Sequence, residues 1–241
     1  MVARERAGIR RGRLARRAAV LAAAAAALAI LGGGVSWAAE TIRASPLSNT
    51  YTAPSYDMAA GEVPVFGNDS VGDIPHDVAA TARGPDGRFL FKSKVIGSNE
   101  STPVNGTQYL NPGTYRFFCT IHGSSMSANL QVGPGNPEAR PRLEVAVLSR
   151  RIGAVRRSDK LRVRLSGGGS NARGVALVAK LRARRIGGER GVSIAAGESR
   201  RLTIDLSRRG RQALAGRERA AVTVKATVPF GAPDTARRLL R

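Results

Sequence analysis

The stretch TYRFFCTIHGSSM, residues 114–126, decides how the chain around it folds. Residues 114–119 are β-branched or aromatic apart from Arg116 and the closing cysteine, and such runs favour a β-strand. The preceding Asn-Pro-Gly at 111–113 is a turn signature. We therefore expect a strand that delivers Cys119 at its end, followed by a tight loop over residues 120–125.

Short strands are predicted on both sides of this run. Upstream, predicted short strands at 62–66 and 78–82 flank a turn at 67–70, whereas residues 40–60 are expected to form a loop or a frayed strand. Downstream, residues 128–132 alternate and close the domain. Short strands between turns, without a long amphipathic helix, indicate an all-β sandwich or barrel.

The strand pattern continues after a linker at 135–141. Residues 207–214 are expected to form one helical turn, and Gly-rich turns are expected at 167–170 and 187–188. With these turns between strands, residues 142–241 predict a second β-sandwich, typical of an immunoglobulin-like module. The runs that alternate or are apolar are 143–147, 161–165, 175–179, 202–206 and 221–226.

The N-terminal segment has the composition of an export signal. Seven arginines lie within the first 17 residues, and an apolar core of about 14 residues is followed by small residues up to Ala39. We expect a signal helix cleaved near Ala39, with an uncleaved membrane anchor as the alternative. Either way, the rest of the chain is expected in an extracellular, cell-envelope or periplasm-like space. The predicted parts are 1–39 (signal peptide or anchor), 40–134 (first domain), 135–141 (linker) and 142–241 (second domain).

The formal net charge of +22 is unevenly distributed. Residues 40–139 carry six Lys and Arg against nine Asp and Glu, whereas residues 140–241 carry 26 against seven. The basic half is either a solvated arginine-rich face or a surface for anionic cell-envelope polymer or lipid headgroups. Nucleic acid is disfavoured as a partner, because export separates the chain from it and no aromatic platform lies among the arginines.

The chain contains one cysteine and two histidines, and their positions point to one site. Cys119, His122 and Met126 lie close together in the sequence, and His76 lies about forty residues upstream. A thiolate, two imidazoles and a thioether are the donor set of a mononuclear blue-copper site. We therefore take these four residues as candidate ligands of one copper ion that cycles between Cu(I) and Cu(II).

Other interpretations of these residues remain open. Zinc could bind the same set, although structural zinc prefers more thiolates or a closed Cys/His tetrad. Cys119 could instead be a buried core residue beside an unrelated histidine. A Cys–His nucleophile is disfavoured, because neither an orienting carboxylate nor an oxyanion hole is evident nearby, and we expect no enzyme activity. If a metal binds, Phe117, Phe118, Ile121 and Pro75 are expected to exclude water from it.

The stretch from about Val63 to Val132 resembles the cupredoxins of the plastocyanin and pseudoazurin type. The matching features are PHDV at 75–78, NPGTYRFFC at 111–119 and the spacing Cys119-x2-His122-x3-Met126. The resemblance implies a Greek-key β-sandwich that carries out one-electron transfer. It also implies that His76, Cys119 and His122 are equatorial copper ligands and that Met126 is the axial ligand. Residues 142–241 resemble, more loosely, the Ig-like modules of secreted bacterial proteins.

These observations together predict an exported type 1 copper protein that carries single electrons between redox partner proteins. One alternative is an extracytoplasmic module that binds or delivers copper. Another is a structural envelope protein with a vestigial site.

Overall fold

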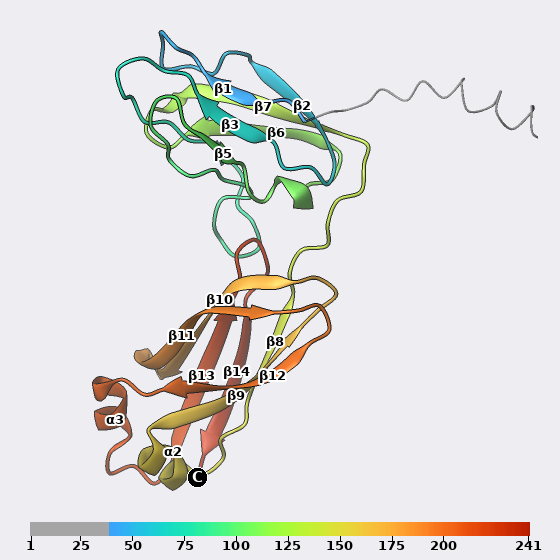
Figure 1. Cartoon of the computed structure of the whole chain (residues 1–241). Helices are drawn as coiled ribbons and strands as arrows, with labels where there is room; N and C mark the ends of the chain where they lie inside the picture. The colour runs from blue at the N-terminus through green and yellow to red at the C-terminus, as the bar shows by residue number, and fades with distance from the viewer. Residues whose placement is uncertain (1–38) are drawn as a thin grey trace, which may run out of the picture. The chain divides into compact units, whose positions relative to one another are not determined.

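A computed structural model describes residues 39–241 of the chain. In this range the chain forms fourteen β-strands, two short α-helices and one 3-10 helix (Figure 1). The predicted all-β fold is confirmed. The predicted signal peptide or anchor lies outside the described residues except at Ala39. Within residues 39–241, no helix has the length and apolar character needed to cross a bilayer.

Residues 42–133 form the first sandwich, which has two sheets. A three-stranded sheet has the order β1-β3-β5, and a four-stranded sheet has the order β2-β7-β6-β4. β1 pairs in parallel with β3, and β2 pairs in parallel with β7, whereas the other pairs are antiparallel. The elements are β1 (Ile42–Ala44), β2 (Ser55–Ala59), β3 (Val65–Asn68), β4 (Ala79–Ala80), β5 (Ser101–Pro103), η1 (Thr107–Tyr109), β6 (Gly113–Cys119) and β7 (Gly123–Gly133).

The two central strands of the four-stranded sheet supply the core of this sandwich by alternation. In β6, Phe117 and Cys119 are buried, and in β7, Met126 and Leu130 are buried, because every second residue points to the same face. Around Phe117 the aromatic rings of Tyr51, Tyr56 and Phe91 pack in tilted or edge-to-face arrangements. Cys119, the next buried residue of β6 after Phe117, therefore lies beside this aromatic core.

Two sequence-based expectations for this region were wrong. Residues 40–60, expected to be a loop or one frayed strand, contain both β1 and β2. The turn expected at 67–70 begins later, because β3 continues to Asn68. The buried Asn68 amide donates to the carbonyl oxygens of Ile74 and Ile96, at 2.8 and 3.1 Å, which explains why a residue typical of turns is retained in a strand.

Residues 143–240 form the second sandwich. Its sheets have the orders β11-β10-β13-β14 and β12-β9-β8, and they enclose a separate aliphatic core. The five predicted strands are present, and α2, β11 and β14 are additional to them. The elements are β8 (Leu143–Val147), α2 (Ile152–Ser158), β9 (Lys160–Gly167), β10 (Ala172–Leu181), β11 (Arg184–Ile194), β12 (Ser199–Asp205), α3 (Arg208–Leu214), β13 (Ala220–Thr227) and β14 (Asp234–Leu240).

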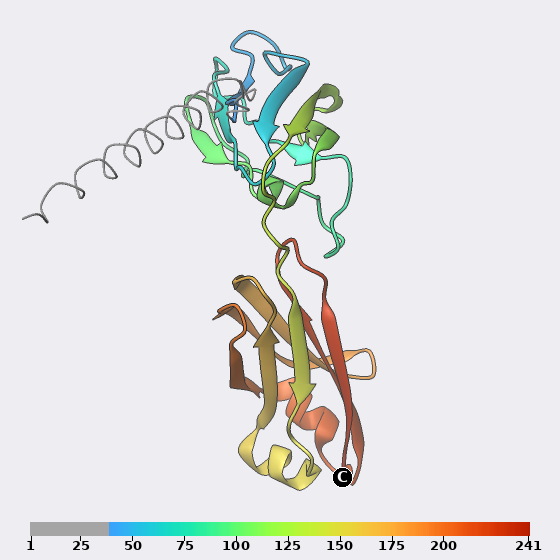
Figure 2. The ribbon, with the colours of Figure 1, turned by 90° about the vertical axis from the view of Figure 1, so that its right-hand side faces the viewer.

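The helix α3 is the predicted helical turn, and it begins at a side-chain cap. The hydroxyl of Ser207 accepts the backbone N–H of Gly210 at 3.0 Å, which satisfies one of the free donors at a helix start. Both α3 and α2 lie at the end of the second sandwich that also holds the C-terminus (Figure 1, Figure 2). The immunoglobulin-like character of this sandwich and the domain boundaries stay predictions.

The two helices of the second sandwich give opposite expectations for a Gly→Ala substitution. Alanine in a helix is normally better than glycine by about 1 kcal/mol. At Gly210, however, a Cβ would clash with the carbonyl oxygen of Ile186, so we expect Gly210→Ala to lower the free energy of unfolding by about 1–3 kcal/mol. Gly153→Ala in α2 meets only the end of the flexible Arg157 side chain and should be neutral or stabilising. Thermal unfolding of the two variants checks this, and equal midpoints would contradict it.

Candidate metal centre

Three segments bring the predicted nitrogen and sulfur donors together. Cys119 is the last residue of β6, and His122 lies in the three-residue turn that leads to β7. His76 precedes β4 and is fixed by two backbone hydrogen bonds with Ile96, of 3.0 and 3.1 Å. Cys119 and His76 are fully buried, whereas His122 is half-buried. The centre therefore lies at the edge of the core, with only His122 reaching toward solvent.

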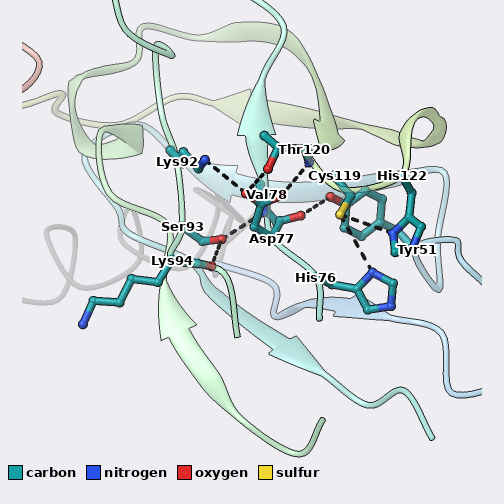
Figure 3. A network of polar contacts seen from close by, with 10 residues as sticks. All are labelled: Tyr51, His76, Asp77, Val78, Lys92, Ser93, Lys94, Cys119, Thr120 and His122. Atoms are coloured by element: carbon teal, nitrogen blue, oxygen red, sulfur yellow. Dashed lines mark hydrogen bonds and ion pairs between the residues drawn. The ribbon is translucent and has the colours of Figure 1, made fainter. Parts of the chain in front are cut away.

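The two imidazoles face the same sulfur atom. The Nδ1 atoms of His76 and His122 lie 3.8 and 3.6 Å from Sγ of Cys119 (Figure 3). One donor atom from each of the three residues lies within 4.8 Å of the others. The sequence-based expectation that these three residues converge agrees with this geometry.

The distances suit a bound metal ion. An ion about 2.0 Å from an imidazole nitrogen and about 2.3 Å from a thiolate sulfur, with an angle of about 120° between the bonds, holds those two atoms about 3.7 Å apart. Both measured nitrogen–sulfur separations are close to this value. Nε2 of His76 is buried without a hydrogen-bond partner among the described residues. The other nitrogen of the ring, Nδ1, faces Sγ of Cys119. The residues present therefore fit a first-row transition metal.

Burial also sets the protonation of groups around the sulfur. Desolvation, followed by the proximity of His122, lowers the pKa of His76, so this imidazole is neutral at neutral pH and its lone pair is free for a metal. Burial, followed by the proximity of Cys119, raises the pKa of Tyr51 far above its usual value. Its hydroxyl is therefore protonated, and it donates to the carbonyl oxygen of Asp77 at 2.6 Å.

Met126 lies in an irregularity of the β6–β7 ladder. Phe118 pairs with Ser127, but the next residue, Cys119, pairs with Gly123, so three residues of β7 bulge out of register. Met126 lies in this bulge, fully buried in the same core cluster as Cys119. The loop expected over 120–125 is therefore only three residues long, and Met126 lies on a strand. Its role as axial ligand stays a prediction.

The carboxylate of Asp77 links two ligand-bearing segments. Asp77 follows His76, and Thr120 follows Cys119. The buried carboxylate accepts the backbone N–H of Thr120 at 2.6 Å and the Thr120 hydroxyl at 2.7 Å (Figure 3). The ammonium of Lys92, 3.2 Å away, balances its charge. These contacts hold His76 and Cys119 at a fixed separation without a metal.

A neighbouring set of hydrogen bonds anchors the His76 segment on its other side. The hydroxyl of Ser93 accepts the N–H of Val78 at 2.9 Å and donates to the carbonyl of Lys94 at 2.8 Å. Sequence reasoning missed Thr120, Lys92 and Ser93. Only Thr120 could have been found from the sequence, because a hydroxyl residue directly after the cysteine and an acid directly after the first histidine each lie one residue from a candidate ligand.

The expected water-excluding shell is only partly present. Phe117 is fully buried and Phe118 is half-buried. Pro75 is exposed, and Ile121 is 46% exposed, because it points outward from the turn that carries His122. The core side of the centre is therefore shielded from solvent, whereas the side that carries His122 is exposed to it.

Removing the Asp77 carboxylate should be costly even without a metal. Asp77→Ala leaves the two Thr120 donors and the Lys92 ammonium without their acceptor, so we expect the free energy of unfolding to fall by at least about 1.5–3 kcal/mol. Asp77→Asn retains an acceptor and should cost less. Asp57→Ala, at an exposed position of β2, is the matched control and should change stability by less than about 0.5 kcal/mol. Urea unfolding of the metal-free protein measures all three, and equal losses for Asp77→Ala and Asp57→Ala would refute the link.

No family model matches the chain, and no curated protein sequence matches it. Among solved structures, it is similar to auracyanin A, a "blue" copper protein from Chloroflexus aurantiacus, at 18% identity over 39% of this chain and 97% of that one, with a TM-score of 0.32. Dithionite-reduced auracyanin from Roseiflexus castenholzii gives 18% identity over 39% and 95%, with a TM-score of 0.31. The BSP domain of a biofilm-associated protein gives 10% identity over 78% of this chain and 28% of that one, with a TM-score of 0.24. At these values, the similarities do not establish a family for this chain.

Proposed function

We propose that the first sandwich binds one copper ion and carries single electrons between redox partner proteins. His76, Cys119 and His122 would hold the ion, with Met126 as a weak fourth ligand. The observation that carries the proposal is the placement of both Nδ1 atoms 3.6–3.8 Å from the sulfur of the only cysteine. Two imidazoles and one thiolate around a common point, with a thioether nearby, are the donors of blue-copper electron-transfer sites.

The same donor set argues against a structural zinc site. Structural zinc is held by four strong Cys or His ligands in a closed tetrahedron. Here the whole chain has one cysteine and two histidines, so only three such ligands exist. A thioether is a poor partner for zinc but suits copper, because it is soft.

Rigidity supports electron transfer over metal release. Asp77 ties the segment after His76 to the segment after Cys119, and the bulged ladder fixes the start of β7. When bound, copper supplies a one-electron couple, and ligands held in place need little rearrangement when the charge changes. His122 is the half-buried ligand, so its ring is the proposed path for electrons to and from a partner.

The chain is also proposed to be exported and to have no substrate turnover. Its N-terminal composition supports export, and the single thiolate surrounded by imidazoles supports metal binding over nucleophilic catalysis.

Copper addition to the purified protein is the direct test. We expect one equivalent of Cu(II) to produce an intense blue colour and a type 1 EPR spectrum, both abolished reversibly by a reductant. Cys119→Ser should lose the colour, because the thiolate is the ligand that produces it, whereas Thr114→Ser at the exposed start of β6 should keep it. Colourless Cu(I) binding with transfer to another protein would instead favour copper delivery. Failure to bind copper would leave the vestigial-site alternative.

The role of Met126 has a separate test. Met126→Leu keeps an apolar side chain of similar volume, so the protein should fold and bind copper, but its reduction potential should shift because the axial ligand tunes it. Met58→Leu is the matched control, since Met58 is equally buried and pairs with Val132 at the far end of β7. An unchanged potential in Met126→Leu would show that Met126 is not a ligand.

A further inference from the structure

The second sandwich has a row of cations on one sheet face. In β9 the residues alternate, so that Leu161, Val163 and Leu165 are buried and the charged residues between them are exposed. These exposed residues are Lys160, Arg162 and Arg164. On the neighbouring strand β12, Arg201 is exposed and lies directly opposite Arg164 in the ladder. Like charges in this arrangement repel, and an anion bound over them would relieve the repulsion.

A groove runs beside this row. It has two adjacent cavities of about 620 and 350 Å³, which share the lining residues Leu148, Arg162 and Thr203. The cations that line it are Arg150, Arg151, Lys160, Arg162 and Arg201, and we call it the basic groove. The hydroxyl groups of Ser149 and Thr203 also line it and can donate hydrogen bonds to an anion, whereas the Ser158 hydroxyl already donates to the carbonyl oxygen of Ala154 at 2.9 Å.

The charge of the basic groove is not paired by any carboxylate in its lining. No carboxylate lines either cavity, and none of its five cations takes part in an ion pair within residues 39–241. Two acids lie on the same sheet face outside the groove: Asp205 opposite Lys160, and Glu144 on β8. The groove therefore presents a concentrated positive field to solvent, without the internal pairing that would neutralise a merely structural cluster.

We infer that the basic groove binds a linear polymer with phosphate groups along its length. Guanidinium groups bind phosphate oxygens through paired hydrogen bonds, which suits an arginine-rich groove. Alternate residues of a strand are about 6.6 Å apart, so Lys160 and Arg162, which line the groove, and Arg164, which lies next to it on β9, together extend over about 13 Å. One phosphate cannot contact them all, whereas a chain of phosphates can. This site is independent of the copper centre and of the function proposed for it.

Two other anionic partners fit the groove less well. A membrane surface is usually met by apolar side chains as well as cations, but among residues 140–241 the only large apolar side chain that is strongly exposed is Leu239, on the other sheet. Single-stranded nucleic acid is normally held by aromatic stacking on its bases, but this half of the chain has one aromatic residue, Phe230, which is not in the groove.

Binding of long-chain inorganic polyphosphate to the full-length protein at physiological salt tests the inference. We expect tighter binding of the polymer than of inorganic phosphate, weakening steeply with salt. The double variant Arg162→Gln/Arg201→Gln should bind the polymer about tenfold or more weakly, since two charge-assisted contacts are lost. Arg173→Gln/Arg237→Gln removes the same charge from exposed positions on the other sheet, and it should bind nearly as the unchanged protein does. Unchanged thermal midpoints show that both variants are folded.

Three outcomes would overturn the inference. Equal weakening in the two double variants would mean that overall charge, not the groove, binds the polymer. Equal affinities for phosphate and polyphosphate would point to a single-anion site. Binding to phosphatidylglycerol vesicles without binding to polyphosphate would assign the face to a lipid surface instead.

Discussion

The buried carboxylate of Asp77 is the constraint on which the candidate metal centre depends. It accepts both donors of Thr120, and it thereby joins the residue after one ligand to the residue after another. A charged acceptor inside a core is tolerated only when its hydrogen bonds are satisfied, and here Lys92 completes them. The separation of His76 and Cys119 is therefore set by contacts within the chain, and these two ligands are positioned before any ion binds.

How much of the fold could be predicted depends on how local the signal is. β8 was predicted with its observed bounds, and α3 was predicted with one additional residue, Ser207, at its start, because both patterns are readable from neighbouring residues. β11 was missed because Gly187 and Gly188 resemble a turn. In the structure, Gly187 lies within the strand, where a Cβ would come within 2.5 Å of the carbonyl oxygen of Asp205. That close approach is a tertiary contact, and it cannot be inferred from the residues next to the glycines in the sequence.

The same distinction applies to the candidate site. Cys119, His122 and His76 could be identified from composition and order alone, since the chain has no other cysteine or histidine. Lys92 and Ser93 could not, because they come from a segment with no distinctive pattern and reach Asp77 and Val78 only after the sheets pack. The position of Met126 on a strand was also hidden, because a bulge depends on the partner strand and not on its own residues.

The parallel pairing of β2 with β7 has a kinetic consequence. Tyr56 pairs with Leu130, so most of the first sandwich must be looped out before this ladder can form. Closing such a large loop costs entropy before any contact compensates for it, and folds built from distant pairings are slow to form. The bulge of β7 lies in the β6–β7 hairpin, whose strands are neighbours in the chain, so Cys119, His122 and Met126 come together without this closure. His76 joins them only when β4 pairs with β6, and a metal ion that meets the chain before that step encounters the hairpin donors alone.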